Sequence, residues 1–141
     1  MTNNKLIYPK TSYKIIGIAF EVYNLLGPRH QEKVYQNSFK VLLKKENLDF
    51  QENLYSPILI KNQIVSKYFL DFLIRGKIVV ELKVGNKIFK RDYLQIRSYL
   101  SQKNLRLGII ILFSPIGVKY KRIINKIRCE SDANSNANKC E

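Results

Sequence analysis

Apolar residues recur every three or four positions between residues 13 and 26, which is the spacing of one face of a helix. The residues that share this face are Ile15, Ile18, Ala19, Val22 and Leu26. The pattern predicts a helix from Tyr13 to Leu26, with the Thr11–Ser12 pair as caps at its start. The dipeptide Gly27-Pro28 follows directly and is typical of a helix end.

Two further segments have helical spacing, one before and one after the central part of the chain. The first predicts a helix from Gln31 to about Glu46, in which we expect buried side chains at Val34, Val41 and Leu42. The second predicts a helix from about Lys90 to Lys103, with Leu94 and Leu100 facing the core. We expect the edges of that inner face to be formed by Tyr93, Ile96 and Tyr99.

Five segments have the length and composition of strands: residues 50–60, 64–74, 78–84, 105–113 and 118–124. Pro57 in the first segment indicates an edge strand or a bulge. The run 105–113 is almost uniformly apolar, as expected of a strand covered on both faces. The order helix, helix, three strands, helix, two strands indicates an α/β (α+β) protein.

The length and composition indicate one folded domain. The chain has 141 residues, 45% of them hydrophobic, which is enough for a single core. Residues 1–10 form a polar lead-in, we expect the domain to span residues 11–127, and the Ser- and Asn-rich tail 128–141 is predicted to be disordered. The longest apolar run is far below the about 20 residues of a membrane span, and the N-terminus lacks a secretory core. We therefore expect a cytoplasmic protein without a membrane partner.

The most informative stretch is YFLDFLIRGKIVVELK, residues 68–83. Gly76 supplies the positive φ of a tight hairpin, and a turn about this residue places Asp71 opposite Glu81. Directly opposed side chains have Cβ atoms about 4.5–5.5 Å apart, and Lys83 shares the face of Glu81 because strand side chains alternate. Two facing carboxylates repel unless a cation lies between them or one is protonated. The pair therefore predicts a functional site, and its repulsion predicts that removing either acid leaves the fold intact and makes it more stable.

Charge and cysteine content narrow the classes of function. The chain has 25 Lys and Arg against 11 Asp and Glu, a net charge of +14, which favours a polyanionic partner such as nucleic acid. Compositional bias of the coding sequence is an equally good explanation for the charge alone. Both cysteines, Cys129 and Cys140, fall in the tail and His30 is the single histidine, so a zinc site has too few ligands. A metal here would be held by oxygen.

Several segments match, in order, a known family: IIGIAFEVYNLLGPRHQEKVY at 15–35, then YFLDFLI, VVELK, QIRSYL and LRLGIIILF. Over residues 11–125 the chain resembles the GxxExxY proteins, a group assigned to the PD-(D/E)XK nuclease superfamily. Glu32 and Tyr35 match the naming motif, whereas Arg29 occupies its glycine position. The strand motif, Asp71 followed by Glu81-Leu82-Lys83, matches in full. The resemblance implies a restriction-endonuclease-like core, with a central mixed sheet of about five strands flanked by helices.

The candidate chemistry is metal-dependent cleavage of phosphodiester bonds in nucleic acid, with DNA favoured over RNA. Asp71 and Glu81 are expected to bind Mg²⁺, or Mn²⁺ as a substitute, because hard cations take carboxylate oxygens. Lys83 is placed to orient the attacking water or to stabilise charge on the phosphate. The resemblance adds the backbone carbonyl of Leu82 as a ligand.

The resemblance also implies two further site residues outside the strand motif. Glu32 matches a carboxylate of the N-terminal helices that approaches the metal. Gln95 matches a polar residue of the helix after the motif strand, and Tyr99 is a weaker candidate one turn further along. The acid pair could instead form a salt bridge with Lys83 or Lys67. Ordinary surface or packing roles are the alternatives for Glu32, Gln95, Glu21, His30 and Tyr35.

Two classes of function stay open at this point. The complete set of Asp, Glu and Lys favours a metal-dependent nuclease. The small size favours a catalytically weak or inactive nucleic-acid-binding or accessory module that keeps the nuclease fold, or a chain that works with a partner, including a homodimer. A structural role in a repair or defence assembly cannot be ranked against these. No helix-turn-helix or other base-reading motif is evident.

Overall fold

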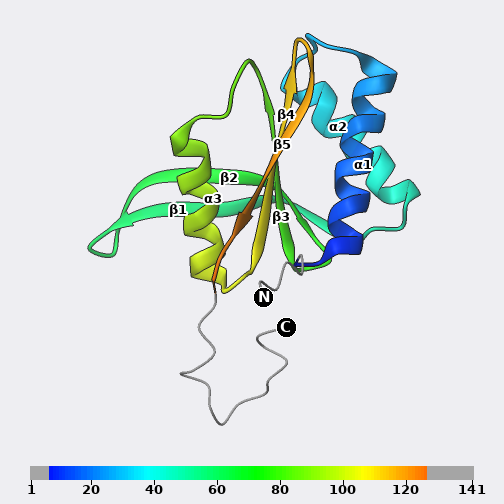
Figure 1. The fold of residues 1–141 in the computed structure, drawn as a ribbon. Coiled ribbons are helices and arrows are strands. Elements are labelled where there is room, and N and C mark those ends of the chain that lie inside the picture. The colour runs from blue at the N-terminus through cyan, green and yellow to red at the C-terminus, as the bar shows by residue number, and fades with distance from the viewer. Residues whose placement is uncertain (1–6, 127–141) are drawn as a thin grey trace, which may run out of the picture.

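The computed structural model describes residues 7–126, and over this range the chain forms three helices and five strands (Figure 1). Their order is the predicted one. They are α1 (Pro9–Leu26), α2 (Glu32–Lys45), β1 (Phe50–Ile60), β2 (Gln63–Ile74), β3 (Ile78–Val84), α3 (Lys90–Lys103), β4 (Leu107–Ser114) and β5 (Gly117–Ile124). The tail expected to be disordered and the first six residues of the lead-in lie outside the described residues. Within residues 7–126 no helix is long and apolar enough to cross a membrane.

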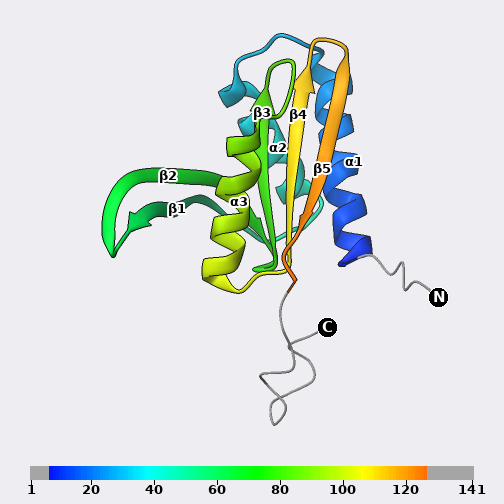
Figure 2. The same ribbon diagram turned by 60° about the vertical axis from the view of Figure 1, so that its left-hand side comes forward.

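The five strands form one mixed sheet in the order β1-β2-β3-β4-β5. Only β3 and β4 run parallel, and the other neighbours are antiparallel. Parallel neighbours need a crossover, and α3 supplies it. Helices α1 and α2 cover one face of the sheet and α3 the other, as Figure 2 shows. All eight residues of β4 are buried between these layers, which confirms the prediction of a strand covered on both faces.

Helix α1 turns its predicted apolar face to the sheet, with Ile15, Ile18, Ala19 and Val22 buried. The helix begins at Pro9 rather than Tyr13, so the last two residues of the expected lead-in are helical. Proline suits the first helical position because its missing N–H would have no intrahelical partner there. The Thr11–Ser12 pair therefore lies inside the helix and does not cap it. Ser12 is buried and accepts a hydrogen bond from the Arg122 guanidinium of β5.

Two residues predicted to face the core are exposed. Val41 of α2 is 63% exposed, because the helix buries the row Tyr35, Phe39, Leu42 and Leu43 instead. Leu94 of α3 is 52% exposed, because that helix buries Ile96, Tyr99 and Leu100. In both helices the exposed residue lies two positions from a buried one, which at 100° per residue is nearly the opposite side.

Helix α3 packs very closely on β4 at Gly108. A Cβ atom built on Gly108 would lie 2.5 Å from Cγ2 of Ile96, inside any normal contact distance. The absence of a side chain at this position thus lets the helix approach the sheet. The same contact fixes the height of α3 over β3 and β4, and with it the position of the first turn of the helix.

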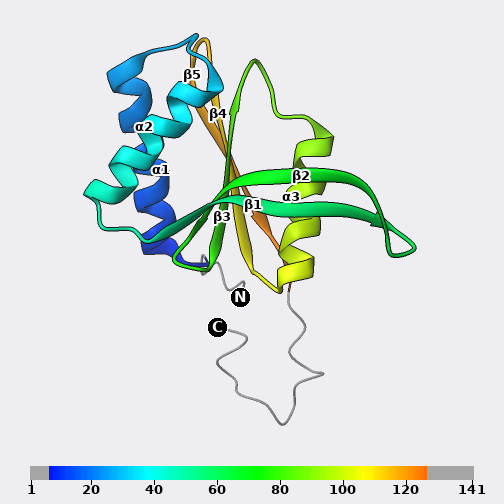
Figure 3. The same cartoon turned by 180° about the vertical axis from the view of Figure 1, so that it is seen from behind.

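The hairpin of β2 and β3 has the predicted register about Gly76, with Phe72 paired to Val80 and Ile74 to Ile78. Backbone pairing stops at Phe72 and Val80. Beyond this point β2 stays paired only with β1, and the two strands extend past α3 as a two-stranded ribbon (Figures 1 and 3). β1 is an edge strand that contains Pro57, so the first of the two alternatives, an edge strand, is confirmed, and the register against β2 shifts between Ile58 and Leu59.

Candidate active site

The candidate site lies where β2 separates from β3. There the Asp71 N–H donates to Glu81 Oε1 at 3.0 Å, and the Leu82 N–H donates to Asp71 Oδ2 at 2.8 Å. Each carboxylate thus satisfies a backbone donor of the other strand, at the point where the backbone pairing of β2 with β3 has stopped. Asp71 and Glu81 are held beside each other by main-chain donors, which offsets part of the repulsion between them.

Lys83 is held in place by three neighbours. Its Nζ donates to the Tyr68 hydroxyl at 3.1 Å and lies 3.4 Å from Glu81 Oε2. Asp92 Oδ1 of α3 lies 3.5 Å from the same ammonium. The Tyr68 hydroxyl in turn donates to Glu81 Oε2 at 2.8 Å. The salt bridge to Lys83, which the sequence left as the alternative to a functional site, is therefore present, and it involves Glu81 rather than Asp71.

A second connection runs from Asp71 to helix α2. The Gln36 side-chain amide donates to Asp71 Oδ1 at 2.9 Å and to Glu32 Oε2 at 3.1 Å. Glu32, predicted as a site residue, thus reaches Asp71 through one bridging side chain. Asp71 borders a small hollow that is also lined by residues of α2, and Lys83 lines a cavity that is also lined by residues of α3. Glu81 lies between the two, because it contacts both Asp71 and Lys83.

Burial disfavours the charged form of the acids at this site. Glu81 is only 4% exposed, and burial followed by the nearby Asp71 charge raises its pKa to about 8. Burial also raises the pKa of Asp71, against the opposing effect of the Leu82 N–H. Glu32 lies at the exposed rim of the site, where partial loss of water around its carboxyl group raises the pKa and the charge of Asp71 adds to this effect. All three acids thus favour a nearby positive charge.

The pKa values of the two groups that contact Glu81, the Lys83 ammonium and the Tyr68 hydroxyl, are raised for different reasons. Burial lowers the pKa of the Lys83 ammonium, but the Tyr68 hydroxyl and the acids Glu81 and Asp92 outweigh it and raise the pKa. Lys83 is therefore a permanent cation. Burial, followed by the Glu81 charge, raises the pKa of Tyr68 to about 12, so its hydroxyl keeps its proton.

A polar cavity of about 200 Å³ lies beside Lys83. Its lining residues are Tyr68, Lys83, Val84, Lys87, Phe89, Arg91, Asp92 and Gln95. The cations of Lys87 and Arg91 lie 5.1 and 4.7 Å from the centroid of the Phe89 ring. Gln95 thus lies at the cavity, whereas Tyr99 is buried in the core under α3. The cavity combines three cationic side chains with the neighbouring acids.

Three residues of this arrangement were not singled out from the sequence as site residues: Gln36, Tyr68 and Asp92. Gln36 follows Glu32 by four positions, which places both on one side of a helix. Asp92 accepts a hydrogen bond from the Phe89 N–H at the start of α3, so a helix-start motif could have located it. Tyr68 lies three positions before Asp71 and offers no comparable signal.

The remaining sequence candidates lie outside this cluster. Tyr35 stacks on Phe113 with ring centroids 4.3 Å apart, and its hydroxyl donates to the Gly27 carbonyl at 2.6 Å. Its expected packing or capping role is confirmed. His30 is exposed, with Nε2 2.8 Å from the Leu26 carbonyl oxygen, as expected for a surface residue in the turn. Glu21 is exposed on α1.

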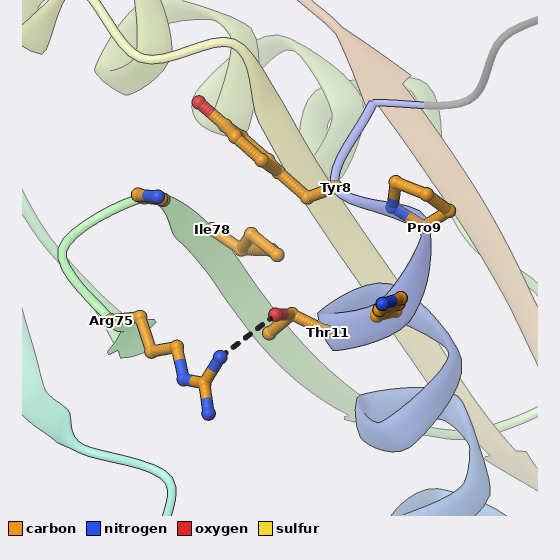
Figure 4. Close-up of a pocket in the computed structure, with 7 residues that line it drawn as sticks. Tyr8, Pro9, Thr11, Arg75 and Ile78 are labelled. Atoms are coloured by element: carbon orange, nitrogen blue, oxygen red, sulfur yellow. Dashed lines mark hydrogen bonds between the residues drawn. The ribbon is translucent and has the colours of Figure 1, made fainter.

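A different pocket, of about 220 Å³, lies at the start of α1 against the β2–β3 turn (Figure 4). Its lining includes Tyr8, Lys10, Arg75 and Lys77, and the Arg75 guanidinium donates to the Thr11 hydroxyl at 3.4 Å. Lys77 Nζ lies 5.4 Å from the centroid of the Tyr8 ring. None of the acids at the strand separation lines this pocket.

The acids at the strand separation suit a metal held by few protein ligands. Within residues 7–126 no three His, Cys, Asp or Glu side chains are grouped to hold an ion. Mg²⁺ does not need such a group, because it is usually bound by one or two carboxylates plus waters and substrate oxygens. Asp71 and Glu81 are such a pair, and their raised pKa values indicate that a dication would stabilise their charged forms.

The profile of the PD-(D/E)XK nuclease superfamily matches residues 9–123. The chain therefore belongs to this superfamily, as its mixed sheet and helix arrangement also indicate. Among solved structures, the crystal structure of SSO0001 is 21% identical in sequence, with a TM-score of 0.52. The match covers 84% of this chain and 61% of SSO0001, and it concerns the fold alone. No curated protein matches the chain.

Proposed function

We propose that the protein is a divalent-metal-dependent nuclease that hydrolyses phosphodiester bonds in DNA. The observation that carries this proposal is the convergence of Asp71, Glu81 and Lys83 where β2 leaves β3. A buried acid and a half-buried acid, both with raised pKa values and beside a fixed ammonium, are costly in a fold that has no use for them. Membership of a nuclease superfamily supports the same reaction class.

In this proposal the carboxylates of Asp71 and Glu81 hold Mg²⁺, or Mn²⁺ in its place. The Leu82 carbonyl is a further ligand, and Glu32 acts close to Asp71 through Gln36. When bound, the dication would supply charge neutralisation for the phosphate and would lower the pKa of the attacking water. Gln36 and the Leu82 N–H orient the Asp71 carboxylate, and Tyr68 orients Glu81.

Lys83 is the residue proposed to act on the reacting phosphate. Its ammonium remains charged, and three neighbours restrict where it can point. A fixed cation beside the acids stabilises negative charge that develops on the phosphate, without reorganisation during the reaction. Gln95 and Arg91 line the same cavity and are placed to contact substrate oxygens.

The net charge and the cavity lining support nucleic acid as the substrate class. The chain carries a charge of +14, and Lys83, Lys87 and Arg91 all line the cavity beside the acids. Cationic side chains at a reactive site favour a substrate with repeating phosphates.

The decisive experiment incubates the purified protein with linear, circular and single-stranded DNA, and with RNA, in Mg²⁺, Mn²⁺ or EDTA. We expect cleavage of DNA with either metal and none in EDTA. Glu81→Gln should abolish cleavage, whereas Glu21→Gln, which removes an exposed acid of α1, should leave it unchanged. Metal-independent binding without cleavage by the parent protein would instead support the accessory-module alternative.

A further inference from the structure

Phe89 places an exposed aromatic ring in the polar, cationic cavity beside Lys83. It directly precedes α3, in the N-cap position, where Ser, Thr, Asp, Asn and Gly are the preferred residues. Its side chain is 43% exposed and lines the cavity. Among the described residues, it belongs to neither of the two apolar clusters that pack on the faces of the sheet. Neither helix capping nor core packing therefore accounts for a phenyl ring at this position.

Asp92 links the position of Phe89 to the candidate active site. Its Oδ2 accepts a hydrogen bond from the Phe89 N–H at 2.9 Å, and its Oδ1 lies 3.5 Å from Lys83 Nζ. Asp92 is only 6% exposed, so the carboxylate that joins the two residues is enclosed by the fold. The backbone of Phe89 is thus held one side chain away from the ammonium proposed to act on the phosphate.

Two cationic side chains lie against the ring of Phe89. Lys87 Nζ and Arg91 Cζ lie 5.1 and 4.7 Å from the ring centroid, within the about 6 Å of a cation–π contact. The ring keeps its 43% exposure with both cations in place. A ring flanked by cations fits a nucleotide strand, because each base of such a strand has a phosphate on either side.

We propose that Phe89 is a stacking platform for an unpaired base of the substrate, and that the chain therefore acts on single-stranded DNA. This inference rests on the nuclease function proposed above and names its substrate class. Proteins that bind single strands combine aromatic rings, on which bases stack, with cations that follow the backbone. The cavity holds both, because Lys83, Lys87 and Arg91 line it together with Phe89.

The ring and the size of the cavity disfavour a duplex as the occupant. Within a duplex both faces of a base are covered by its neighbours, so a protein ring stacks only on a base that is unpaired or extruded. Extrusion costs free energy that a single strand does not require. The cavity of about 200 Å³ is smaller than the roughly 300–1,000 Å³ of a typical small-molecule site, so it admits part of one nucleotide and not a paired helix.

Fluorescence anisotropy in EDTA tests the inference with three labelled oligonucleotides of equal length: a single strand, its duplex, and a strand of abasic sugar-phosphate units. Phe89→Leu should weaken binding of the single strand about tenfold, because leucine is apolar but has no ring on which a base can stack. Binding of the abasic strand and of the duplex should not change. Phe89→Trp should bind the single strand at least as tightly as the parent.

Phe20→Leu is the matched control, because it removes a ring that is 42% exposed on α1, and it should bind all three oligonucleotides as the parent does. Thermal unfolding shows whether each variant is folded. The salt dependence separates stacking from charge. Phe89→Leu should keep the parent's slope of log affinity against log salt, since its phosphate contacts remain.

Single-strand binding by Phe89→Leu that equals the parent's overturns the inference. An equal loss of affinity for the abasic strand also overturns it, and would assign the ring a structural role at the start of α3.

Cleavage in Mg²⁺ is measured separately, so that the two proposals fail in different ways. We expect the parent to cleave the single strand faster than the duplex, and Phe89→Leu to reduce this preference. Equal cleavage of both substrates by the parent and by Phe89→Leu would overturn the single-strand inference and leave the nuclease function. A parent that cleaves neither substrate, but binds single strands through Phe89, would overturn the nuclease function alone.

Discussion

Asp71 and Glu81 each accept a hydrogen bond from a backbone N–H of the opposite strand, just beyond the last paired residues of β2 and β3. The Asp71 N–H binds Glu81 at 3.0 Å, and the Leu82 N–H binds Asp71 at 2.8 Å. The acids are therefore part of the strand separation itself, because they satisfy two main-chain donors that the separation exposes. Their removal should affect both the candidate chemistry and the stability of the hairpin.

Asp71→Ala should unfold more easily than Asp71→Asn, by about 1–3 kcal/mol, because alanine leaves the Leu82 N–H without its acceptor. Asparagine keeps an oxygen at that position but loses the charge. We expect neither variant to cleave DNA. Urea denaturation of the metal-free proteins measures the difference. Equal stability of the two variants would mean that the hydrogen bond from the Leu82 N–H contributes little to the stability of the hairpin.

The stability of the metal-free protein should fall as the pH rises from about 4.5 to about 8. The folded pKa of Glu81 is about 8, above its ordinary value of 4.5, so the folded state binds the proton more tightly than the unfolded state. This stabilisation is complete below pH 4.5 and is lost as the pH rises through 8. The raised pKa of Asp71 acts in the same direction.

Thermal unfolding in EDTA across this pH range checks the prediction. Glu81→Gln should flatten the dependence, since an amide does not titrate, and Glu21→Gln should keep the slope of the parent. Mg²⁺ should restore stability at the upper end of the range, because an ion that binds only the folded state stabilises it. A pH dependence that survives in Glu81→Gln would contradict the assignment to this carboxyl.

Tyr68→Phe should lower the cleavage rate about 10–100-fold while leaving DNA affinity unchanged. The lost hydroxyl both donates to Glu81 and accepts from Lys83, and partners of this kind typically contribute that much to metal affinity or activity. Cleavage measured against Mg²⁺ concentration tests the effect. Tyr120→Phe on β5 is the matched control and should behave as the parent. Full activity of Tyr68→Phe would show that Lys83 needs no such support.

Lys87→Ala and Arg91→Ala should each reduce the slope of log affinity against log salt by about 1, if each contacts one phosphate. Both line the cavity beside the acids. Fluorescence anisotropy with labelled DNA in EDTA measures binding without cleavage. Lys119→Ala, an exposed lysine of β5, serves as the control. Unchanged slopes for both cavity variants would place the nucleic acid elsewhere.

The hairpin and the order of elements were predictable because they depend on local signals. Gly76 fixes the turn, the turn fixes the register, and the register brings Asp71 beside Glu81. The inner face of α1 and the uniformly buried β4 follow from periodicity in the same way. Contacts between residues close along a hairpin are therefore the best determined part of the site.

Other features depend on packing that periodicity does not describe. Val41 and Leu94 fit an apolar pattern but point to solvent, since larger neighbours set the rotation of each helix. Gln36 and Asp92 join the site only after α2 and α3 dock on opposite faces of the sheet. The exposed ribbon of β1 and β2 was also unforeseen, because its apolar strands have the composition of covered sheet strands.

The close approach of α3 at Gly108 has a consequence for inherited variation in this protein. A methyl group there would meet Ile96 at 2.5 Å, and the helix would have to rise from the sheet. Asp92 and Gln95 would travel with it, away from Lys83. Gly108 has no reactive group, yet its substitution should lower activity as much as substitution of the acids does. The chain would still fold, and the activity would be lost because α3 is displaced.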